Sequence, residues 1–238
     1  MTDHPVVAGV DGCRGGWLCV WGPADEPASL RAALIDHPGG IATLTPAPSV
    51  VGADVPIGLA EASPRGCDLA ARARLGRPRG SSVFPAPIRP MLTAADYPTA
   101  CAIGRARAGR ALSRQAWNIV PLIHAMDRFL QRDTQWRERV YEVHPELSFA
   151  LWNGGTPMRH NKKRSPGRQE RIALIERDLP GALEATQDAL SGQRYAADDL
   201  LDALAALWSA ARIARGEAVA FPETVETDEC GLPMVIRA

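Results

Sequence analysis

The sequence predicts an α/β protein with a mixed five-stranded sheet flanked by helices, and three observations lead to this prediction. Three short apolar runs near the N-terminus are joined by short loops, which is typical of antiparallel strands. A fourth apolar run copies the glycine and acid spacing of the first. Two later segments have apolar residues at helical spacing, so they predict helices that pack on the sheet.

The first predicted strand, over residues 6–11, ends in Asp11 and a glycine-rich turn. The run is short, β-branched and bounded by glycines, which favours a buried strand over a helix. Period-two alternation places Val7, Gly9 and Asp11 on one face. A buried carboxylate without a partner is costly, so we expect Asp11 to meet a metal, a cation or several donors. The alternative is that Asp11 only opens a turn before Gly12.

The next two strands are expected at residues 17–21 and 30–35, followed by a proline-rich segment with room for one short helix. The fourth strand is expected at residues 50–55, where Gly52 and Asp54 repeat the spacing of Gly9 and Asp11. If these two strands lie side by side, their carboxylates come together.

An arginine-rich, partly helical insertion is expected at about residues 60–112, over the edge of the sheet, with a centre broken by Pro85, Pro87 and Pro90. Its arginines form either a solvated surface or a phosphate-facing one, and charge runs usually face water. A genomic bias toward arginine codons would produce the same excess. Ser113 is expected to cap a helix over residues 114–131, with a kink at Pro121.

The fifth strand is expected over residues 139–146 and ends at its proline, with Glu142 and His144 pointing the same way and Glu146 starting a turn. A basic mobile loop should follow at about residues 153–171. The last long helix, over residues 197–215, carries Asp199 and Asp202 one turn apart. The helix dipole accounts for an acid in the first turn. It does not account for Asp202 among alanines and leucines.

Charge, cysteine content and apolar stretches argue against several classes of protein. The net charge is zero, so there is no global signal for nucleic acid or membrane. Five scattered cysteines without a CxxC pair indicate neither a disulfide framework nor a zinc site. The N-terminus lacks a signal pattern, and the longest apolar stretch, near residues 203–211, is too short for a membrane span. We therefore expect a single cytoplasmic domain over residues 1–238.

This order of elements resembles the ribonuclease H-like fold, and several motifs make the resemblance specific to one family of that fold. They are residues 9–17 (GVDGCRGGW), 54–59 (DVPIGL), 82–85 (SVFP), 112–115 (LSRQ), 142–146 (EVHPE) and the acids of residues 198–206. Together they are similar to a largely uncharacterised bacterial and archaeal family described as predicted nucleases of that fold. The resemblance covers nearly the whole chain.

The resemblance implies a site for Mg²⁺ or Mn²⁺ and a phosphodiester substrate. Acids on the first strand, the fourth strand and the last helix would hold the metal, which implies Asp11, Asp54 and Asp199 or Asp202, with Glu142 as a further ligand or base. Hard cations require such clustered carboxylate oxygens. The residues expected to contact substrate are Arg14, Arg89, Ser113, Gln115, Lys162 and Lys163.

The expected partner is nucleic acid, with DNA and RNA not distinguished; a homodimer stays open. Two alternatives remain. One is a scaffold that keeps the fold without the reaction, although three retained acids would repel one another without metal. The other is an ATPase-type phosphotransfer protein, which needs a second glycine-rich phosphate loop that the chain lacks.

Overall fold

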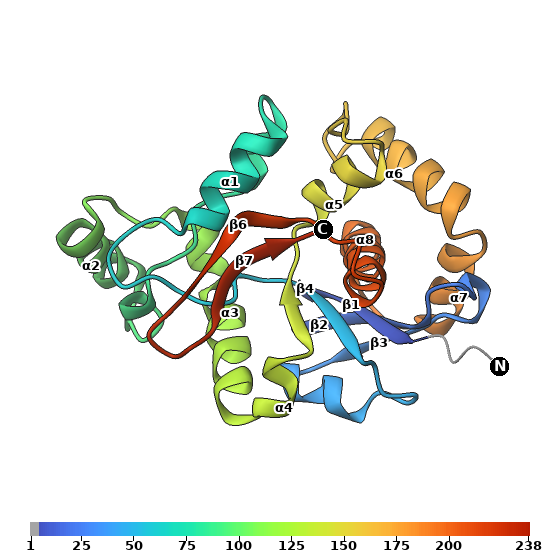
Figure 1. Cartoon of the computed structure of the whole chain (residues 1–238), viewed down its shortest axis with the longest axis horizontal. Helices are drawn as coiled ribbons and strands as arrows, with labels where there is room; N and C mark the ends of the chain where they lie inside the picture. Colours follow the sequence, from blue (N-terminus) through green and yellow to red (C-terminus); the bar gives the residue numbers. More distant parts are fainter. Residues whose placement is uncertain (1–4) are drawn as a thin grey trace. The chain divides into compact units, whose positions relative to one another are not determined.

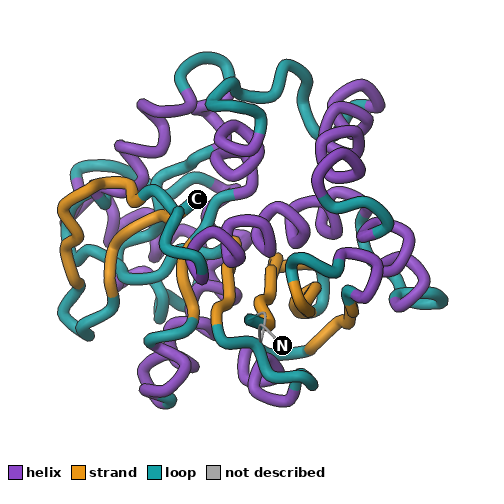
Figure 2. The backbone as a smooth tube through the Cα atoms, turned by 45° about the vertical axis from the view of Figure 1, so that its right-hand side comes forward, coloured by secondary structure: helices purple, strands orange, loops and turns teal. Residues whose placement is uncertain are grey.

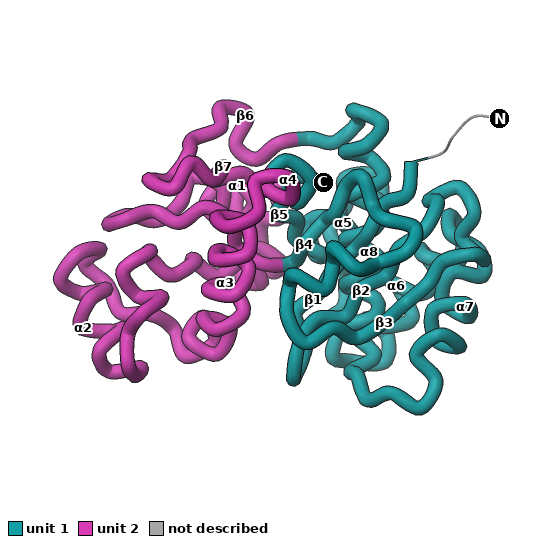
Figure 3. Tube along the Cα trace, turned by 90° about the horizontal axis from the view of Figure 1, so that it is seen from below, with its two compact units in different colours: residues 1–54, 138–219, 237–238 teal, residues 55–137, 220–236 magenta. Residues whose placement is uncertain are grey.

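The computed structural model describes residues 5–238, and the chain divides into two compact units. Unit 1 comprises residues 1–54, 138–219 and 237–238, and unit 2 comprises residues 55–137 and 220–236 (Figure 3). Each unit is therefore built from segments that are distant in the sequence.

Unit 1 contains a five-stranded sheet in the order β3-β2-β1-β4-β5 (Figure 1). Strands β1 to β3 are antiparallel neighbours, whereas β4 and β5 run parallel to β1. The predicted mixed sheet flanked by helices is thus confirmed. The strands are β1 (Val6–Cys13), β2 (Gly16–Pro23), β3 (Arg31–Ile35), β4 (Val50–Asp54) and β5 (Val140–Glu142).

Helix α8 (Ala197–Ala214) packs against β1, β2 and β4. Two glycines make this close approach possible. A Cβ atom on Gly9 would lie 2.0 Å from the carbonyl oxygen of Ala203, and one on Gly52 would lie 2.5 Å from that of Ala206. The register pairs Gly9 with Gly52, so the two glycines together form a patch of the sheet without side chains, against which the helix backbone packs.

The other helices of unit 1, purple like all helices in Figure 2, pack against α8, against one another or against the antiparallel strands β2 and β3. Their contacts with the strands and with α8 bury an apolar core that includes Leu18, Phe149, Ile175, Leu204 and Leu207. These helices are α5 (Pro145–Trp152), α6 (Ser165–Asp178), α7 (Ala182–Ala189) and the short 3₁₀ helices η1 (Pro27–Ser29) and η2 (Pro38–Thr43). Helix η2 is the predicted short helix before the fourth strand.

Unit 2 is mainly helical and adds a two-stranded hairpin. Its elements are α1 (Gly66–Leu75), η3 (Arg79–Ser82), η4 (Arg89–Met91), α2 (Tyr97–Ala108), α3 (Arg114–Arg132), α4 (Thr134–Arg137), β6 (Ala220–Thr227) and β7 (Pro233–Arg237). Ser113 caps α3 as predicted, because its hydroxyl accepts a hydrogen bond from the backbone N–H of Ala116 at 3.0 Å. The hairpin was not predicted from the sequence.

Two predicted boundaries were wrong. Strand β5 ends at Glu142, and Glu146 lies in the first turn of α5 rather than in a turn after the strand. Helix α6 begins at Ser165, inside the segment predicted as a loop up to residue 171. In both helices a proline occupies the first turn, where its missing N–H costs nothing and its fixed φ favours the helix.

Among the described residues, no helix combines the length and the apolar character that crossing a membrane requires.

Candidate metal centre

Three carboxylates from separate elements of unit 1 come together. Asp11 lies on β1, Asp54 ends β4 and Asp202 lies on α8, and one oxygen from each falls within 4.8 Å of the others. The parallel register places Asp11 directly beside Asp54. Helix α8, lying on the two glycines that precede these acids, brings Asp202 to the same place. The sequence pattern of the two strands therefore leads to a shared site.

Burial makes the accumulated negative charge costly. Asp11 is 6% exposed and Asp202 is 3% exposed. Burial raises the pKa of Asp11 well above its usual value, and the charges of Asp54 and Asp202 raise it further. Burial also raises the pKa of Asp202, to about 7, despite the opposing charge of Lys162. The site thus favours either protons or cations beside its oxygens.

Lys162 provides one such cation. Its ammonium group donates a hydrogen bond to Oδ2 of Asp202, and the two side chains are 31% and 4% exposed. Burial alone would lower the pKa of Lys162, but the charge of Asp202 and the hydrogen bond outweigh burial, so the pKa is raised. This lysine stays protonated at neutral pH and offsets one of the three negative charges.

The donor set fits a hard divalent cation. Its atoms are all carboxylate oxygens, and the ion pair with Lys162 shows that positive charge is accommodated there. Oxygen ligands suit Mg²⁺, Ca²⁺ and Mn²⁺, whereas zinc and copper sites favour sulfur or imidazole nitrogen. The three acids could therefore hold a metal ion of this class.

Asp199, the alternative to Asp202, has a different environment. Its carboxylate accepts a hydrogen bond from the backbone N–H of Ala196 at 3.2 Å, at the start of α8. Burial raises its pKa, while that hydrogen bond lowers it. Asp199 is thus placed to stabilise the first turn of the helix, and the three-acid group contains Asp202 instead.

Two further acids lie near the ends of parallel strands in unit 1. Glu142, 5% exposed, ends β5 with its neighbour in the ladder being Ala53, the residue before Asp54. Glu146 lies in the first turn of α5, and its Oε1 accepts a hydrogen bond from Arg171 Nη2 at 2.5 Å. Its Oε2 has no hydrogen-bond partner among the described residues. The charge of Glu146 contributes to the raised pKa of Asp202.

Sequence reasoning missed the role of Arg171, which is completely buried. Besides Glu146, its guanidinium donates hydrogen bonds to the carbonyl oxygens of Gly167 at 2.7 Å and His160 at 3.2 Å. It therefore joins α5, α6 and the segment before α6. Because most basic residues of that segment are exposed, nothing in the sequence distinguishes this one buried arginine from them.

The residues predicted to contact substrate are distributed over both units. In unit 1, Arg14 is exposed in the turn between β1 and β2, and Lys163 is exposed beside Lys162. In unit 2, Gln115 is exposed in the first turn of α3, after the capping Ser113.

Arg89 has internal partners within unit 2. Its guanidinium donates hydrogen bonds to both oxygens of Asp127, at 2.9 and 3.1 Å, and to Oδ2 of Asp228. Asp127 and Asp228 have side chains that are 7% and 0% exposed. Asp228 also accepts hydrogen bonds from the backbone N–H groups of Leu59 and Leu232, both at 2.9 Å. Arg89 therefore connects η4, α3 and the hairpin.

Replacing Arg89 with methionine is expected to destabilise the protein by about 3 kcal/mol, because it leaves two buried carboxylates without their shared cation. Urea unfolding measures the change, with Arg128→Met as control, since Arg128 is exposed on helix α3, next to Asp127. Equal stability of the two variants, with weaker polyanion binding only in Arg89→Met, would instead make Arg89 a substrate contact.

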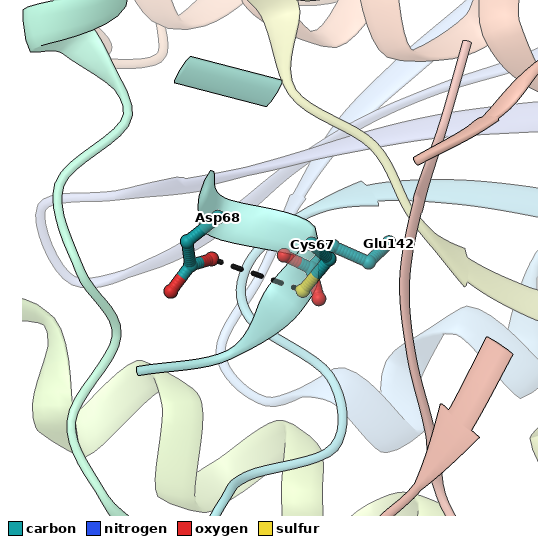
Figure 4. Close-up of side chains that lie close together, drawn as sticks. All are labelled: Cys67, Asp68 and Glu142. Carbon is teal, nitrogen blue, oxygen red and sulfur yellow. Dashed lines mark hydrogen bonds between the residues drawn. The ribbon is translucent and has the colours of Figure 1, made fainter. Parts of the chain in front are cut away.

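A third acid of unit 2, Asp68, also makes contacts that stabilise the fold. Its Oδ1 forms an ion pair with Arg65 at 2.5 Å. The same oxygen accepts a hydrogen bond from the Cys67 sulfur at 3.9 Å (Figure 4). Its Oδ2 accepts the backbone N–H of Ala86 at 2.9 Å. Arg65 in turn donates to the carbonyl oxygens of Ile57 and Gly58, each at 3.1 Å. Asp68 and Arg65 thus tie the start of α1 to two loops.

The chain belongs to a family whose model, described as "Protein of unknown function (DUF429)", matches residues 9–227. The match includes Asp11, Asp54 and Asp202 and extends over both units. No match was found among the curated proteins, and none among the solved structures.

Proposed function

We propose that this protein is a nuclease that depends on Mg²⁺ or Mn²⁺ and has a ribonuclease H-like fold. The observation that carries the proposal is the convergence of Asp11, Asp54 and Asp202 from two parallel strands and a helix. Divalent ions held by clustered carboxylates are a recurring device for cleaving phosphodiesters. The cost of burying three acids together is balanced most directly by such an ion.

The fold proposal is supported by the succession of elements. Three antiparallel strands precede a strand that ends in an acid, then come helices, a short fifth strand and a last helix that carries an acid. This is the succession on which the resemblance to ribonuclease H-like proteins rests. Fold alone does not assign a reaction, so the acids and not the sheet support the activity.

The residues of unit 1 have distinct roles in this proposal. A bound ion would supply a polarised water and neutralise charge on the phosphate. Asp11 and Asp54 would fix the ion from rigid strands, and Asp202 would complete the ligands from α8. Lys162, Lys163 and Arg14 provide positive charge for the phosphate backbone of a nucleic acid, and that contact would weaken with salt.

A panel of labelled single-stranded and double-stranded DNA, RNA and RNA–DNA hybrid tests the proposal. We expect cleavage of at least one substrate with Mg²⁺ or Mn²⁺, none with EDTA, and none by Asp54→Asn purified in the same way. The matched variant excludes a contaminating nuclease. Binding without cleavage under every metal condition would favour the non-catalytic scaffold, and the substrate that is cleaved would distinguish DNA from RNA.

A further inference from the structure

We infer that Lys162 is an internal counter-cation of the three-acid group, which a divalent ion displaces from Asp202. This inference rests on the metal centre of the proposed function. It adds an order of events: the ion enters first, and the ammonium group that it releases then becomes available to a phosphate. Lys162 would thus link metal binding to substrate binding.

Lys162 contacts the three-acid group directly. The ammonium group of Lys162 donates to Oδ2 of Asp202, one of the three acids whose oxygens lie within 4.8 Å of one another. Asp54 and Asp11 also interact electrostatically with Lys162 and contribute to its raised pKa. A single positive charge therefore contacts Asp202 and acts electrostatically on Asp11 and Asp54 as well.

The chain holds this lysine in place through a segment that is itself well anchored. The backbone N–H groups of Arg159 and His160 donate to the carboxylate of Glu170 at 2.8 and 3.1 Å. Arg171 donates to the carbonyl oxygen of His160, and Arg164 N–H donates to that of Asn161 at 3.0 Å. Residues 159–164 are thus tied to Glu170 and Arg171 of α6.

The segment before α6 also fits closely against the first turn of that helix. A Cβ atom on Gly167 would lie 2.2 Å from the carbonyl oxygen of Asn161, so only glycine permits the approach. With the backbone fixed on both sides of Lys162, its flexible side chain is the part that can leave Asp202. The anchored loop would then keep the released ammonium group close to the metal.

Electrostatics determines the direction of the effect. An ammonium group and a divalent ion repel each other, and inside a partly buried group of carboxylates this repulsion is poorly screened. Both also compete for oxygens of Asp202. Removing the charge of Lys162 should therefore strengthen metal binding, whereas a residue that only orients a ligand would weaken it when removed.

Calorimetric titration of the full chain with Mn²⁺, after EDTA treatment and dialysis, tests the inference. Lys162→Gln is expected to bind Mn²⁺ roughly 10-fold more tightly than the natural protein, the change expected when one repelling charge near the ion is removed. Lys163→Gln is the matched control, since it removes the same charge from an exposed neighbour, and it should bind within about 2-fold of the natural protein.

A second variant guards against a change in folding. Lys162→Arg keeps a cation beside Asp202 and should bind Mn²⁺ no more tightly than the natural protein, and circular dichroism compares the folds of all variants. Equal or weaker binding by Lys162→Gln, with normal binding by the natural protein, would overturn the inference alone. If neither protein bound Mn²⁺, the metal centre and the inference would both be overturned.

Discussion

Replacing Asp11 with asparagine is expected to reduce the affinity for Mg²⁺ and Mn²⁺ by about 100-fold or more and to abolish cleavage, because loss of a direct ligand should exceed the 10- to 100-fold cost of disturbing a residue behind one. In the natural protein, either ion should raise the melting temperature by mass action, since the unfolded chain presents no comparable site. The variant should lose that response at the same metal concentrations.

Without metal, the same variant should be as stable as the natural protein or more stable. Asp11 is buried, and burial together with the charges of Asp54 and Asp202 raises its pKa, so a neutral amide of similar shape removes repulsion. Thermal unfolding in EDTA measures this. Asp36→Asn is the control, because Asp36 is exposed in unit 1 and its replacement should change neither property.

Two results would contradict this expectation. If Asp11→Asn unfolded in EDTA, the carboxylate would be a structural partner, and the nuclease proposal would lose its central residue. If the natural protein showed no metal-dependent change in melting temperature, a non-catalytic scaffold would be favoured over the nuclease for this protein.

The pairing of Asp11 with Asp54 could be predicted because it depends on local patterns. Alternation fixes the face on which each acid lies, and the repeated glycine and acid spacing matches once the two strands are neighbours. The choice between Asp199 and Asp202 could not be predicted. Both lie on one stripe of the helix, and only the packing of α8 on the sheet shows which one reaches the strands.

The ion pairs could not be predicted from the sequence for a different reason. Lys162 meets Asp202 across 40 residues, and Arg89 meets Asp228 across 139. No periodicity connects such partners, and an arginine-rich composition makes each basic residue look solvated. The boundary of the fifth strand failed because the proline that ends a strand equally well begins a helix.

Replacing Gly9 with alanine is expected to have the largest effect on folding. The new methyl carbon would lie 2.0 Å from the carbonyl oxygen of Ala203 and 2.2 Å from the backbone nitrogen of Leu207. Both are main-chain atoms of α8, so no side chain can turn aside. Separation of the helix from β1 would open the core of unit 1, at a cost of about 3 kcal/mol or more.

Urea unfolding measures this loss, and Gly66→Ala is the control because a methyl group there meets only a proline ring atom, 3.9 Å away. The control should unfold at the urea concentration of the natural protein or slightly above it, since alanine suits the helix α1 in which Gly66 lies. If Gly9→Ala remains folded at low temperature, it should bind Mn²⁺ more weakly than the natural protein, because a displaced α8 carries Asp202 away from Asp11 and Asp54. Unfolding of Gly9→Ala at the same urea concentration as the control, with unchanged Mn²⁺ binding, would mean that α8 does not rest on this strand, and the route by which Asp202 reaches the strand acids would have to be abandoned.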